Sequence, residues 1–337
     1  MEQLSAVLAQ RLGGDGLAEL IGTVSGNINV ILKIRYQGLT LGVRLAVNTY
    51  RFKYEKTIIK EIFTLYLIHY GHGAVDNPKL RSVIDNILAS PVGGPIEHSL
   101  VRRVIHYDWS LSTLPWPFFI FEWIDGNILW HQHGESGYFE AGRTLAKLHR
   151  IKFDAYYRDI FSIGNEPLSQ TVHFARALAT ERQLAESLLP AVVLSKLDAL
   201  DPDTLPPTHP CLVHNDYSGG NIIIGADGEQ RIIDWDNWVI DAPELDLLKM
   251  KYWTAIGPDG LLIAVPALYQ AFLQGYTGSA DTTINDQRLY AYEVLWLTRA
   301  FTFESVHRDH RSHVTSGTAL ARHYPPARFY QDYLLAL

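Results

Sequence analysis

Four polar residues in the middle of the chain have the types and the spacing that phosphoryl transfer requires. His214 and Asp216 follow the apolar run 211–213, Asn221 comes five residues after Asp216, and Asp234 ends a later apolar run. A carboxylate can orient or deprotonate an attacking hydroxyl, and hard oxygen ligands can hold the magnesium ions that bridge nucleotide phosphates. The set therefore suits the transfer of a phosphoryl group to a hydroxyl.

Two short strands would bring these side chains together. Residues 222–224 are three isoleucines, residues 226–228 (Ala-Asp-Gly) form a hairpin turn signal, and the returning strand 231–233 ends on Asp234 and Asp236. An Asp/Asn-rich hairpin can also be turn chemistry alone, because both residue types favour turns. That alternative explains the turn at 226–228, but not four spaced polar residues bracketed by isoleucines.

The block resembles the aminoglycoside phosphotransferase and choline kinase family of small-molecule kinases. That family carries His-x-Asp-x-x-x-x-Asn and then an apolar strand ending Ile-Asp-Trp/Phe-Asp/Glu, and residues 214–221 and 233–236 match every position. Asn215 departs from protein kinases, which have arginine there, and no long activation segment is visible before Pro243. The resemblance implies an α+β, protein-kinase-like fold, with an antiparallel β-sheet and one helix in an N-terminal lobe and a mainly α-helical C-terminal lobe.

The same resemblance implies the roles of the central residues. Asp216 would orient the acceptor hydroxyl and accept its proton, while Asn221 and Asp234 would hold Mg²⁺. ATP or GTP would be the phosphoryl donor. An interlobe boundary is expected at residues 125 and 126, so that 1–125 form the nucleotide-binding lobe and 126–337 the catalytic and substrate-binding lobe.

The N-terminal part has the elements that such a lobe needs. Helical spacing at 4–12 precedes two strands around the turn Ser25, Gly26 and Asn27, and a third strand carries Arg44. The small turn can approach phosphates through its backbone amides, although it is first of all a hairpin turn.

The resemblance gives Arg44 a phosphate-binding role. Its partner would be Glu61, or else Glu55, on the helix predicted over residues 54–70. The alternative is a surface arginine and a solvated helix glutamate.

The apolar strand predicted over residues 118–124 resembles the family's hinge. Backbone groups of Glu122, Trp123 and Ile124 would there bind the nucleotide base. A buried strand in a sheet core would have the same composition, so the order of the elements carries this prediction.

Beyond the hinge the pattern becomes helical. Helices are predicted around 139–149, 170–200, 244–248, 262–276, 285–306 and 325–336. Asp246 is expected to brace the catalytic loop, and His149 to be a packed, hydrogen-bonded histidine. A metal site at His307, His310 and His313 is disfavoured, because no cysteine or carboxylate completes it.

Five carboxylates not used by the catalytic set are candidates for binding a cationic acceptor. They are Asp236, Asp241, Glu244, Glu293 and Glu304. The alternative is that they cap helices and face water.

An aminoglycoside-like antibiotic or related natural product is the first choice of acceptor. Choline, ethanolamine, homoserine, thiamine or a sugar are alternatives. A non-catalytic pseudokinase is disfavoured, because Asp216, Asn221 and Asp234 are all present.

Bulk composition sets the limits. The chain has 337 residues, 47% hydrophobic and 19% charged, which suffices for two lobes. A net charge of −7 argues weakly against nucleic-acid binding, and the single cysteine, Cys211, excludes a disulfide within the chain. No signal peptide and no run of about 18 apolar residues is visible. We therefore expect a cytoplasmic protein that does not bind membranes. The sequence does not indicate its oligomeric state.

Overall fold

The computed structural model describes residues 1–25, 30–47, 60–61, 100–108, 110–132, 134–157, 166–278, 282–314 and 324–337. The chain forms two compact units. Unit 1 comprises residues 1–84, 97–127 and 223–237, and unit 2 comprises 85–96, 128–222 and 238–337. The predicted catalytic block is therefore divided between the two units. Residues 223–237 belong to unit 1, and the segments before and after them belong to unit 2.

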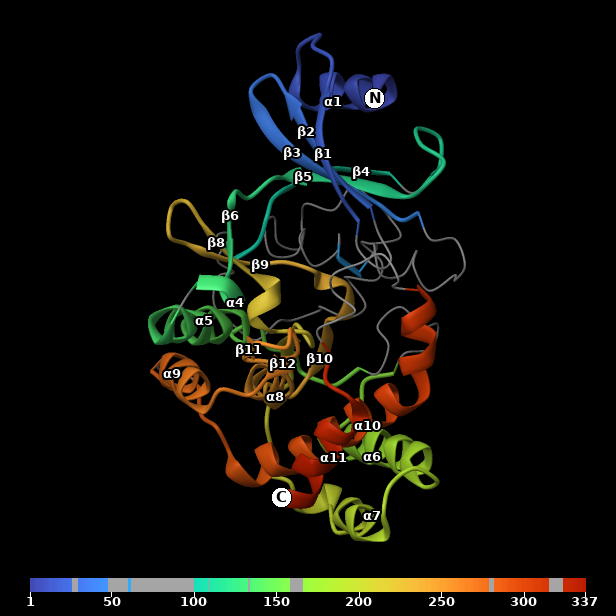
Figure 1. Ribbon diagram of the computed structural model, residues 1–337, viewed down its shortest axis with the longest axis vertical. Helices are drawn as coiled ribbons and strands as arrows, with labels where there is room; N and C mark the ends of the chain where they lie inside the picture. Colours follow the sequence, from blue (N-terminus) through green and yellow to red (C-terminus); the bar gives the residue numbers. More distant parts are fainter. Residues whose placement is uncertain are drawn as a thin grey trace. The chain divides into compact units, whose positions relative to one another are not determined.

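A five-stranded antiparallel sheet in the order β1-β2-β3-β5-β4 forms the centre of unit 1. Its strands are β1 (Glu19–Ser25), β2 (Val30–Tyr36), β3 (Leu39–Leu45), β4 (Val104–Asp108) and β5 (Phe118–Glu122). Side chains alternate between the two faces of a strand. Phe118 and Ile120 of β5 accordingly pack in a core with Leu4 and Leu8 of helix α1 (Glu2–Leu12), which lies beside the blue strands in Figure 1.

A second, three-stranded sheet in the order β6-β8-β9 follows the hinge segment. Its strands are β6 (Gly126–Ile128), β8 (Ile222–Gly225) and β9 (Gln230–Ile232). Gly228 has a φ of 81°, the left-handed conformation that the predicted hairpin turn requires. The hairpin thus delivers Asp234 directly beyond the end of β9.

Helices dominate unit 2. They are α4 (Leu129–Gln132), α5 (Glu135–Leu148), α6 (Gln170–Ala185), α7 (Ala191–Asp198), α8 (Glu244–Tyr252), α9 (Pro266–Thr277), α10 (Asp286–Val314) and α11 (Ala327–Ala336). Helices α5 and α9 are far apart in sequence but lie side by side (Figure 1). A Cβ at Gly142 of α5 would meet the backbone of Phe272, and one at Gly275 of α9 would meet that of Phe139. Both glycines therefore permit the close approach of these helices.

Two short antiparallel ribbons complete unit 2. Strand β7 (Cys211–Val213) pairs with β10 (Val239–Asp241), and β11 (Ala255–Ile256) pairs with β12 (Leu262–Ile263). The first ribbon lies in a core with aromatic side chains of α8, α10 and α11. Cys211 is fully buried there, and burial raises the pKa of its thiol, as expected for a residue that acts as a small hydrophobe.

The element order follows the sequence prediction closely, with differences at some boundaries. Residues 262–263 are a strand rather than the start of α9, because they pair with β11. Helix α10 continues to Val314, beyond its predicted end at residue 306. Of the helix predicted over 54–70 only Lys60 and Glu61 are described.

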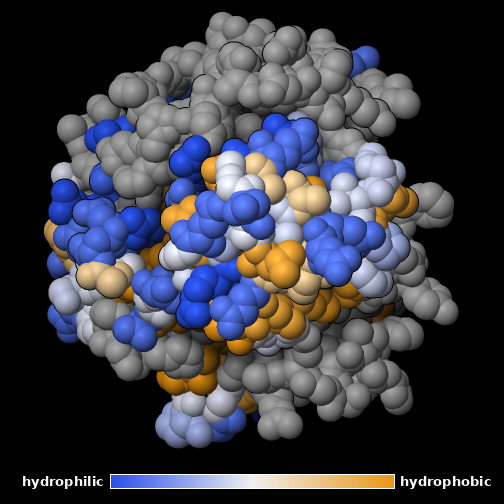
Figure 2. Space-filling model, turned by 90° about the horizontal axis from the view of Figure 1, so that it is seen from above, coloured by the Kyte–Doolittle hydropathy of each residue, from blue (hydrophilic) through white to orange (hydrophobic). Residues whose placement is uncertain are grey.

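Apolar and polar side chains lie side by side on the face drawn in Figure 2, where orange areas adjoin blue ones. Leu17, Leu20 and Val24 are among the exposed apolar residues of unit 1. Among the described residues, no helix is both long enough and apolar enough to cross a membrane.

Candidate active site

The loop after β7 is held by one buried carboxylate. The backbone amides of His214 and Asn215 donate to the two oxygens of Asp246, at 2.8 and 2.7 Å. Asp246 lies in the first turn of α8, and its side chain is fully buried. The predicted bracing role of Asp246 is thereby confirmed.

His149 supports the same carboxylate from α5. Its Nε2 lies 3.2 Å from Asp246, and its Nδ1 lies 2.9 Å from the hydroxyl of Tyr276. Burial lowers the pKa of His149, although the neighbouring Asp246 acts in the opposite direction. A buried histidine bonded on both ring nitrogens agrees with the packed role predicted for it.

Asn215 has a φ of 61°, in the left-handed region that few non-glycine residues adopt. Asparagine tolerates this conformation better than most residues, and tight bonding of its amide to Asp246 holds it there. The sharp turn sends the chain directly into Asp216.

Both oxygens of the Asp216 carboxylate are engaged by side chains of unit 2. The Asn221 amide donates to Oδ2 at 3.1 Å and to the Asp216 carbonyl at 2.9 Å. The Lys249 ammonium donates to Oδ1 at 3.0 Å. Because the Asp216 side chain is 19% exposed, an incoming hydroxyl can still reach it.

Lys249 was not recognised from the sequence. It follows Asp246 by three residues, and residues three apart share one helix face, so this spacing could have revealed it. Its ammonium lies 3.6 Å from the ring centroid of Trp253, a cation–π contact. The lysine is therefore fixed between a carboxylate and an aromatic ring.

Trp130 supports the turn between Asp216 and Asn221, and it too was missed. Its indole nitrogen donates to the Trp253 carbonyl at 3.3 Å. A Cβ at Gly219 or Gly220 would meet the Trp130 ring. The glycine pair thus lets the catalytic turn pack directly on an indole.

In unit 1, Arg44 of β3 gathers three carboxylates. It is paired with Glu61, lies 3.2 Å from Asp234 and lies 3.6 Å from Asp236. Burial alone would lower the pKa of Arg44, but the three acids together raise it above its ordinary value. The structure therefore pairs Arg44 with Glu61, as the sequence predicted, and also brings Asp234 to the same arginine, while Glu55 lies outside the described residues.

Arg102 is a second cation on Glu61, and sequence reasoning did not find it. Its Nη2 donates to Glu61 at 2.7 Å, and its guanidinium lies 3.7 Å from the ring centroid of Phe121. Burial lowers the pKa of Arg102, while Glu61 acts in the opposite direction. No local motif marks this arginine, because its partners lie 41 and 19 residues away (102 − 61 and 121 − 102).

Asp234 has a φ of 63° and a side chain that is 43% exposed. Its Oδ1 faces Arg44. The side chain of Asn221 turns its nitrogen to Asp216, which leaves the carboxamide oxygen for another partner. Carboxylate and carboxamide oxygens are ligands that Mg²⁺ accepts, so the donor types fit that ion. No group of three or more possible metal ligands occurs within the described residues, and the side chains of His307, His310 and His313 lie outside them.

The predicted hinge residues line a cavity of about 480 Å³ within unit 1. Glu122, Trp123 and Ile124 contribute to it, and the Trp123 amide donates to the Thr40 carbonyl at 3.2 Å. Ser25 is the last residue of β1, while Gly26 and Asn27 lie outside the described residues. Base and phosphate binding at these positions stay predictions.

The five carboxylates proposed for a cationic acceptor are all buried, and four have identified cationic or hydrogen-bonding partners. Asp236 lies near Arg44, Glu244 pairs with Arg288 at 2.6 Å, and Glu293 pairs with Lys251 and Tyr252. Asp241 accepts from His173, from the Ala242 amide and from Tyr292. Glu304 is also buried.

The environment of Asp241 shows how complete this pairing is. Burial would raise the pKa of Asp241, but His173, the Ala242 amide and the Tyr292 hydroxyl hold it below its ordinary value. A carboxylate with three donors has little free capacity for an ammonium group of a ligand.

The chain belongs to the phosphotransferase enzyme family, whose model matches residues 93–282, more than half of the sequence. It is a small-molecule phosphotransferase that uses an alcohol group as acceptor. The family resemblance seen in the catalytic block is thereby confirmed. No curated protein matches the chain.

Solved structures share the fold over nearly the whole chain. Spectinomycin phosphotransferase APH(9)-Ia, in complex with ADP and spectinomycin, is 14% identical with a TM-score of 0.53, covering 99% of this chain and 93% of that one. A thermostable mutant of aminoglycoside phosphotransferase APH(4)-Ia, in complex with ADP and hygromycin B, is 12% identical with a TM-score of 0.57 over 99% and 98%. A protein from Ralstonia eutropha JMP134, provisionally named an aminoglycoside phosphotransferase, is 18% identical with a TM-score of 0.61 over 99% and 98%. These similarities confirm the α+β, protein-kinase-like fold.

Proposed function

We propose that this phosphotransferase moves the γ-phosphoryl group of ATP or GTP to a hydroxyl of a small polar natural product. The observation that carries the proposal is the environment of the Asp216 carboxylate. Its carboxylate is partly exposed, both oxygens are held by Asn221 and Lys249, and the loop below it is fixed by Asp246. Catalysis of phosphoryl transfer depends mainly on such positioning and on electrostatics.

In this proposal Asp216 orients the acceptor hydroxyl and accepts its proton. Asn221 and Asp234 would hold Mg²⁺, which when bound neutralises the charge of the nucleotide phosphates. Arg44, anchored by Glu61, would contact the phosphates, together with the turn of Ser25, Gly26 and Asn27. The adenine or guanine base would lie at the hinge formed by Glu122, Trp123 and Ile124.

Lys249 is a positioning residue in the same scheme. Its ammonium donates to one oxygen of Asp216, so the orientation of the carboxylate is restricted before the acceptor binds. A cation at this place also lies close to where negative charge accumulates during transfer, because the hydroxyl bound by Asp216 is the attacking group.

An aminoglycoside-like antibiotic is one candidate acceptor, and the ADP complexes of the spectinomycin and hygromycin B enzymes support a nucleotide donor and an antibiotic acceptor. Choline, ethanolamine, homoserine, thiamine and sugars are the other candidates within the class. The internal pairing of Asp241, Glu244 and Glu293 removes the main electrostatic reason for preferring a cationic one.

A screen of ATP and GTP against panels of aminoglycosides, amino alcohols, hydroxy acids and sugars tests the proposal. Product mass should rise by one phosphoryl group for at least one acceptor in the presence of Mg²⁺, and Asp216→Asn should abolish that product. If the protein binds nucleotide but phosphorylates no acceptor of these panels, and Asp216→Asn leaves nucleotide binding unchanged, a pseudokinase would be favoured instead.

A further inference from the structure

Glu61 is a buried carboxylate that accepts from two arginines at once. Its Oε1 accepts from Nη2 of Arg102 at 2.7 Å, and its Oε2 accepts from Nη1 of Arg44. The side chain of Glu61 is fully buried, and those of Arg44 and Arg102 are 5% and 8% exposed. Two cations therefore share one carboxylate at a place that water scarcely reaches.

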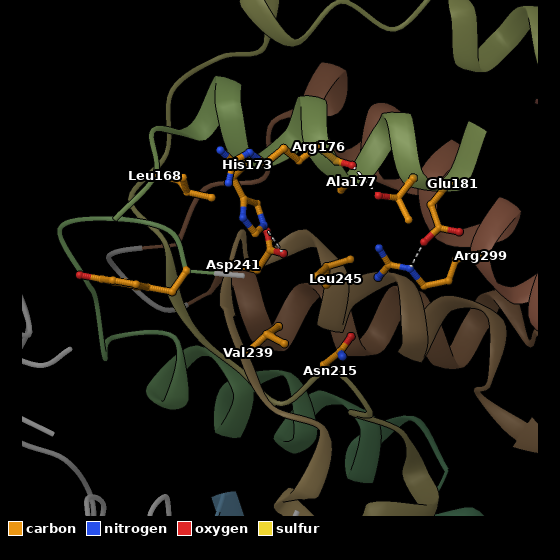
Figure 3. A pocket seen from close by; sticks show the side chains of 12 residues that line it. Leu168, His173, Arg176, Ala177, Glu181, Asn215, Val239, Asp241, Leu245 and Arg299 are labelled. Carbon is orange, nitrogen blue, oxygen red and sulfur yellow. Dashed lines mark hydrogen bonds and ion pairs between the residues drawn. The ribbon is translucent and has the colours of Figure 1, made fainter. Parts of the chain in front are cut away.

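The pairing at Glu61 differs from two other arginine–carboxylate pairs in the described part of the chain. A guanidinium and a carboxylate favour a two-point contact that uses both carboxylate oxygens. Arg231 makes such a contact with Asp227. In Figure 3 the buried Glu181 is bonded to Arg299. At Glu61, in contrast, the two oxygens are bonded to two different arginines.

Arg102 is held beside the five-stranded sheet by contacts other than Glu61. Its guanidinium lies 3.7 Å from the ring centroid of Phe121 and 5.9 Å from that of Phe119, both on β5. Cation–π attraction favours this placement. A Cβ at Gly42 of β3 would meet the Phe121 ring, so the glycine leaves the space in which that ring lies. The packing of β3 and β5 therefore helps to fix Arg102 next to Glu61.

The segment that carries Arg102 is also joined to the strand that leads to Asp234. Val101 forms a parallel bridge with Ile232, which ends β9 two residues before Asp234. The Asp234 carboxylate in turn accepts from Nη1 of Arg44 at 3.2 Å. Arg102 and Asp234 are thus connected twice, once through the backbone and once through the bonded side chains between them.

The charge of Arg102 acts on Arg44. Burial lowers the pKa of Arg102, Glu61 acts in the opposite direction, and the positive charge of Arg44 lowers the pKa further. This repulsion disfavours a second bond from Arg44 to Glu61. Nη1 and Nη2 of Arg44 lie 3.2 Å from Asp234 and 3.6 Å from Asp236. Without Arg102, the vacated oxygen of Glu61 could instead take a two-point contact with Arg44.

We propose that Arg102 is a positioning residue for phosphoryl transfer. By occupying Oε1 of Glu61 it limits Arg44 to a one-point contact there, and so keeps the Arg44 guanidinium directed towards Asp234 and the nucleotide phosphates. The inference rests on the proposed function, because it takes Arg44 as the residue that contacts phosphates. The alternative is that Arg102 only neutralises a buried carboxylate and stabilises the fold.

Arg102→Met tests the positioning role, because it removes the charge and keeps much of the side-chain volume. The affinity for Mg²⁺–ATP should fall by about tenfold, since a charge-assisted contact of Arg44 with a phosphate is weakened. The affinity for adenosine, which has no phosphate, should be retained. Arg102→Lys returns a cation to Glu61 and should recover most of the loss. Calorimetry on the full chain measures each affinity, and GTP and guanosine are compared in the same way.

Arg35→Met is the matched control for these variants. Arg35 lies on β2 of the same sheet, is exposed and pairs with Glu19 at 3.3 Å, so its loss should alter neither affinity. Wild-type affinity for Mg²⁺–ATP in folded Arg102→Met would overturn the proposal. An equal loss of ATP and adenosine binding would also overturn it, because that result indicates a purely structural role.

A double-mutant comparison tests whether Arg102 acts through Glu61. Glu61→Gln should weaken Mg²⁺–ATP binding, and adding Arg102→Met should cause no further loss, because no carboxylate is left for Arg102 to hold. The double variant should also be at least as stable as Glu61→Gln, since a buried cation without a carboxylate is removed. A further loss of affinity would contradict the proposal. This comparison does not need Arg102→Met alone, so it decides the question even if that variant fails to fold.

Arg44→Gln separates failure of this inference from failure of the proposed function. If Arg44→Gln weakens Mg²⁺–ATP binding and Arg102→Met does not, Arg44 keeps its phosphate-binding role and only the role of Arg102 is refuted. If Arg44→Gln leaves the affinity unchanged, the proposed phosphate contact of Arg44 is refuted, and the positioning role of Arg102 is refuted with it.

Discussion

The ammonium of Lys249 lies 3.0 Å from Asp216 Oδ1, although the two residues are 33 positions apart in the chain. The lysine also lies 3.6 Å from the ring centroid of Trp253, and its side chain is 14% exposed. Asp246, one turn earlier on α8, fixes the loop that carries Asp216. One helix therefore controls both the backbone and the carboxylate of the catalytic loop.

We predict that Lys249→Met lowers turnover by about a hundredfold, because a preorganised charged donor beside the reacting groups is lost. The affinity for Mg²⁺–ATP should stay within about threefold. Steady-state kinetics and calorimetry separate the two effects. Lys196→Met, on α7, serves as the control.

Chemical rescue sharpens the test of Lys249. Added ethylamine should restore part of the activity of Lys249→Ala, because a small amine can occupy the space left between Asp216 and Trp253. Added ethylamine should not raise the activity of Asp216→Asn. An unaltered kcat in Lys249→Met would show that the lysine only packs against Trp253.

Asp216→Asn is expected to lower turnover by about two or more orders of magnitude, since a carboxamide cannot accept the hydroxyl proton. Its shape is retained, so the contact with Asn221 can be kept and nucleotide affinity should change only a few-fold. Single-turnover product formation is the measurement. A variant that turns over at nearly the normal rate would remove Asp216 from the catalytic role.

Asp234→Ala should abolish Mg²⁺-dependent nucleotide binding while the protein stays folded. Arg44 remains paired with Glu61 and near Asp236, so no buried charge is left without a partner. Calorimetry with Mg²⁺–ATP gives the affinity, and circular dichroism reports the fold. Asp332→Ala, at an exposed position of α11, is the control. Equal affinity in wild-type protein and Asp234→Ala would exclude Asp234 as a metal ligand.

The catalytic block could be predicted from sequence because its chemistry is local. His214 to Asn221 and Asp234 lie within one loop and one hairpin, and isoleucines mark the strands on either side. Hydrophobic periodicity also gave most helices and strands, because each buries one face. Boundaries failed where a tertiary partner decided them, as at Leu262 and Ile263, which pair with β11.

The supporting residues could not be read in the same way. Arg102 and Trp130 act through partners that are distant in sequence, and only the folded chain brings Arg102 to Glu61 or Trp130 to the glycine turn. The sequence also gives the charge of a carboxylate but not its neighbours. Asp241 and Glu244 therefore looked like acceptor ligands, whereas the fold pairs them with His173 and Arg288.

His149 provides a prediction about stability and pH. It is buried between Asp246 and Tyr276, and burial lowers its pKa below the ordinary value of 6.5. The unfolded chain therefore takes up a proton at a higher pH than the folded protein does. By linkage, the free energy of unfolding should decrease as the pH falls below about 6.5, by up to about 1.4 kcal/mol per pH unit for this one group.

His149→Gln removes the titrating ring and can still donate to Asp246 or accept from Tyr276. The variant should be less stable than wild-type protein at pH 8, because some packing is lost, but its stability should depend less steeply on pH between about 6.5 and 5. Urea unfolding at half-unit pH steps measures both slopes. His209→Gln, in the linker before β7, is the matched control and should retain the wild-type slope. Parallel pH profiles for wild-type protein and His149→Gln would mean that His149 does not contribute to the acid sensitivity of the fold.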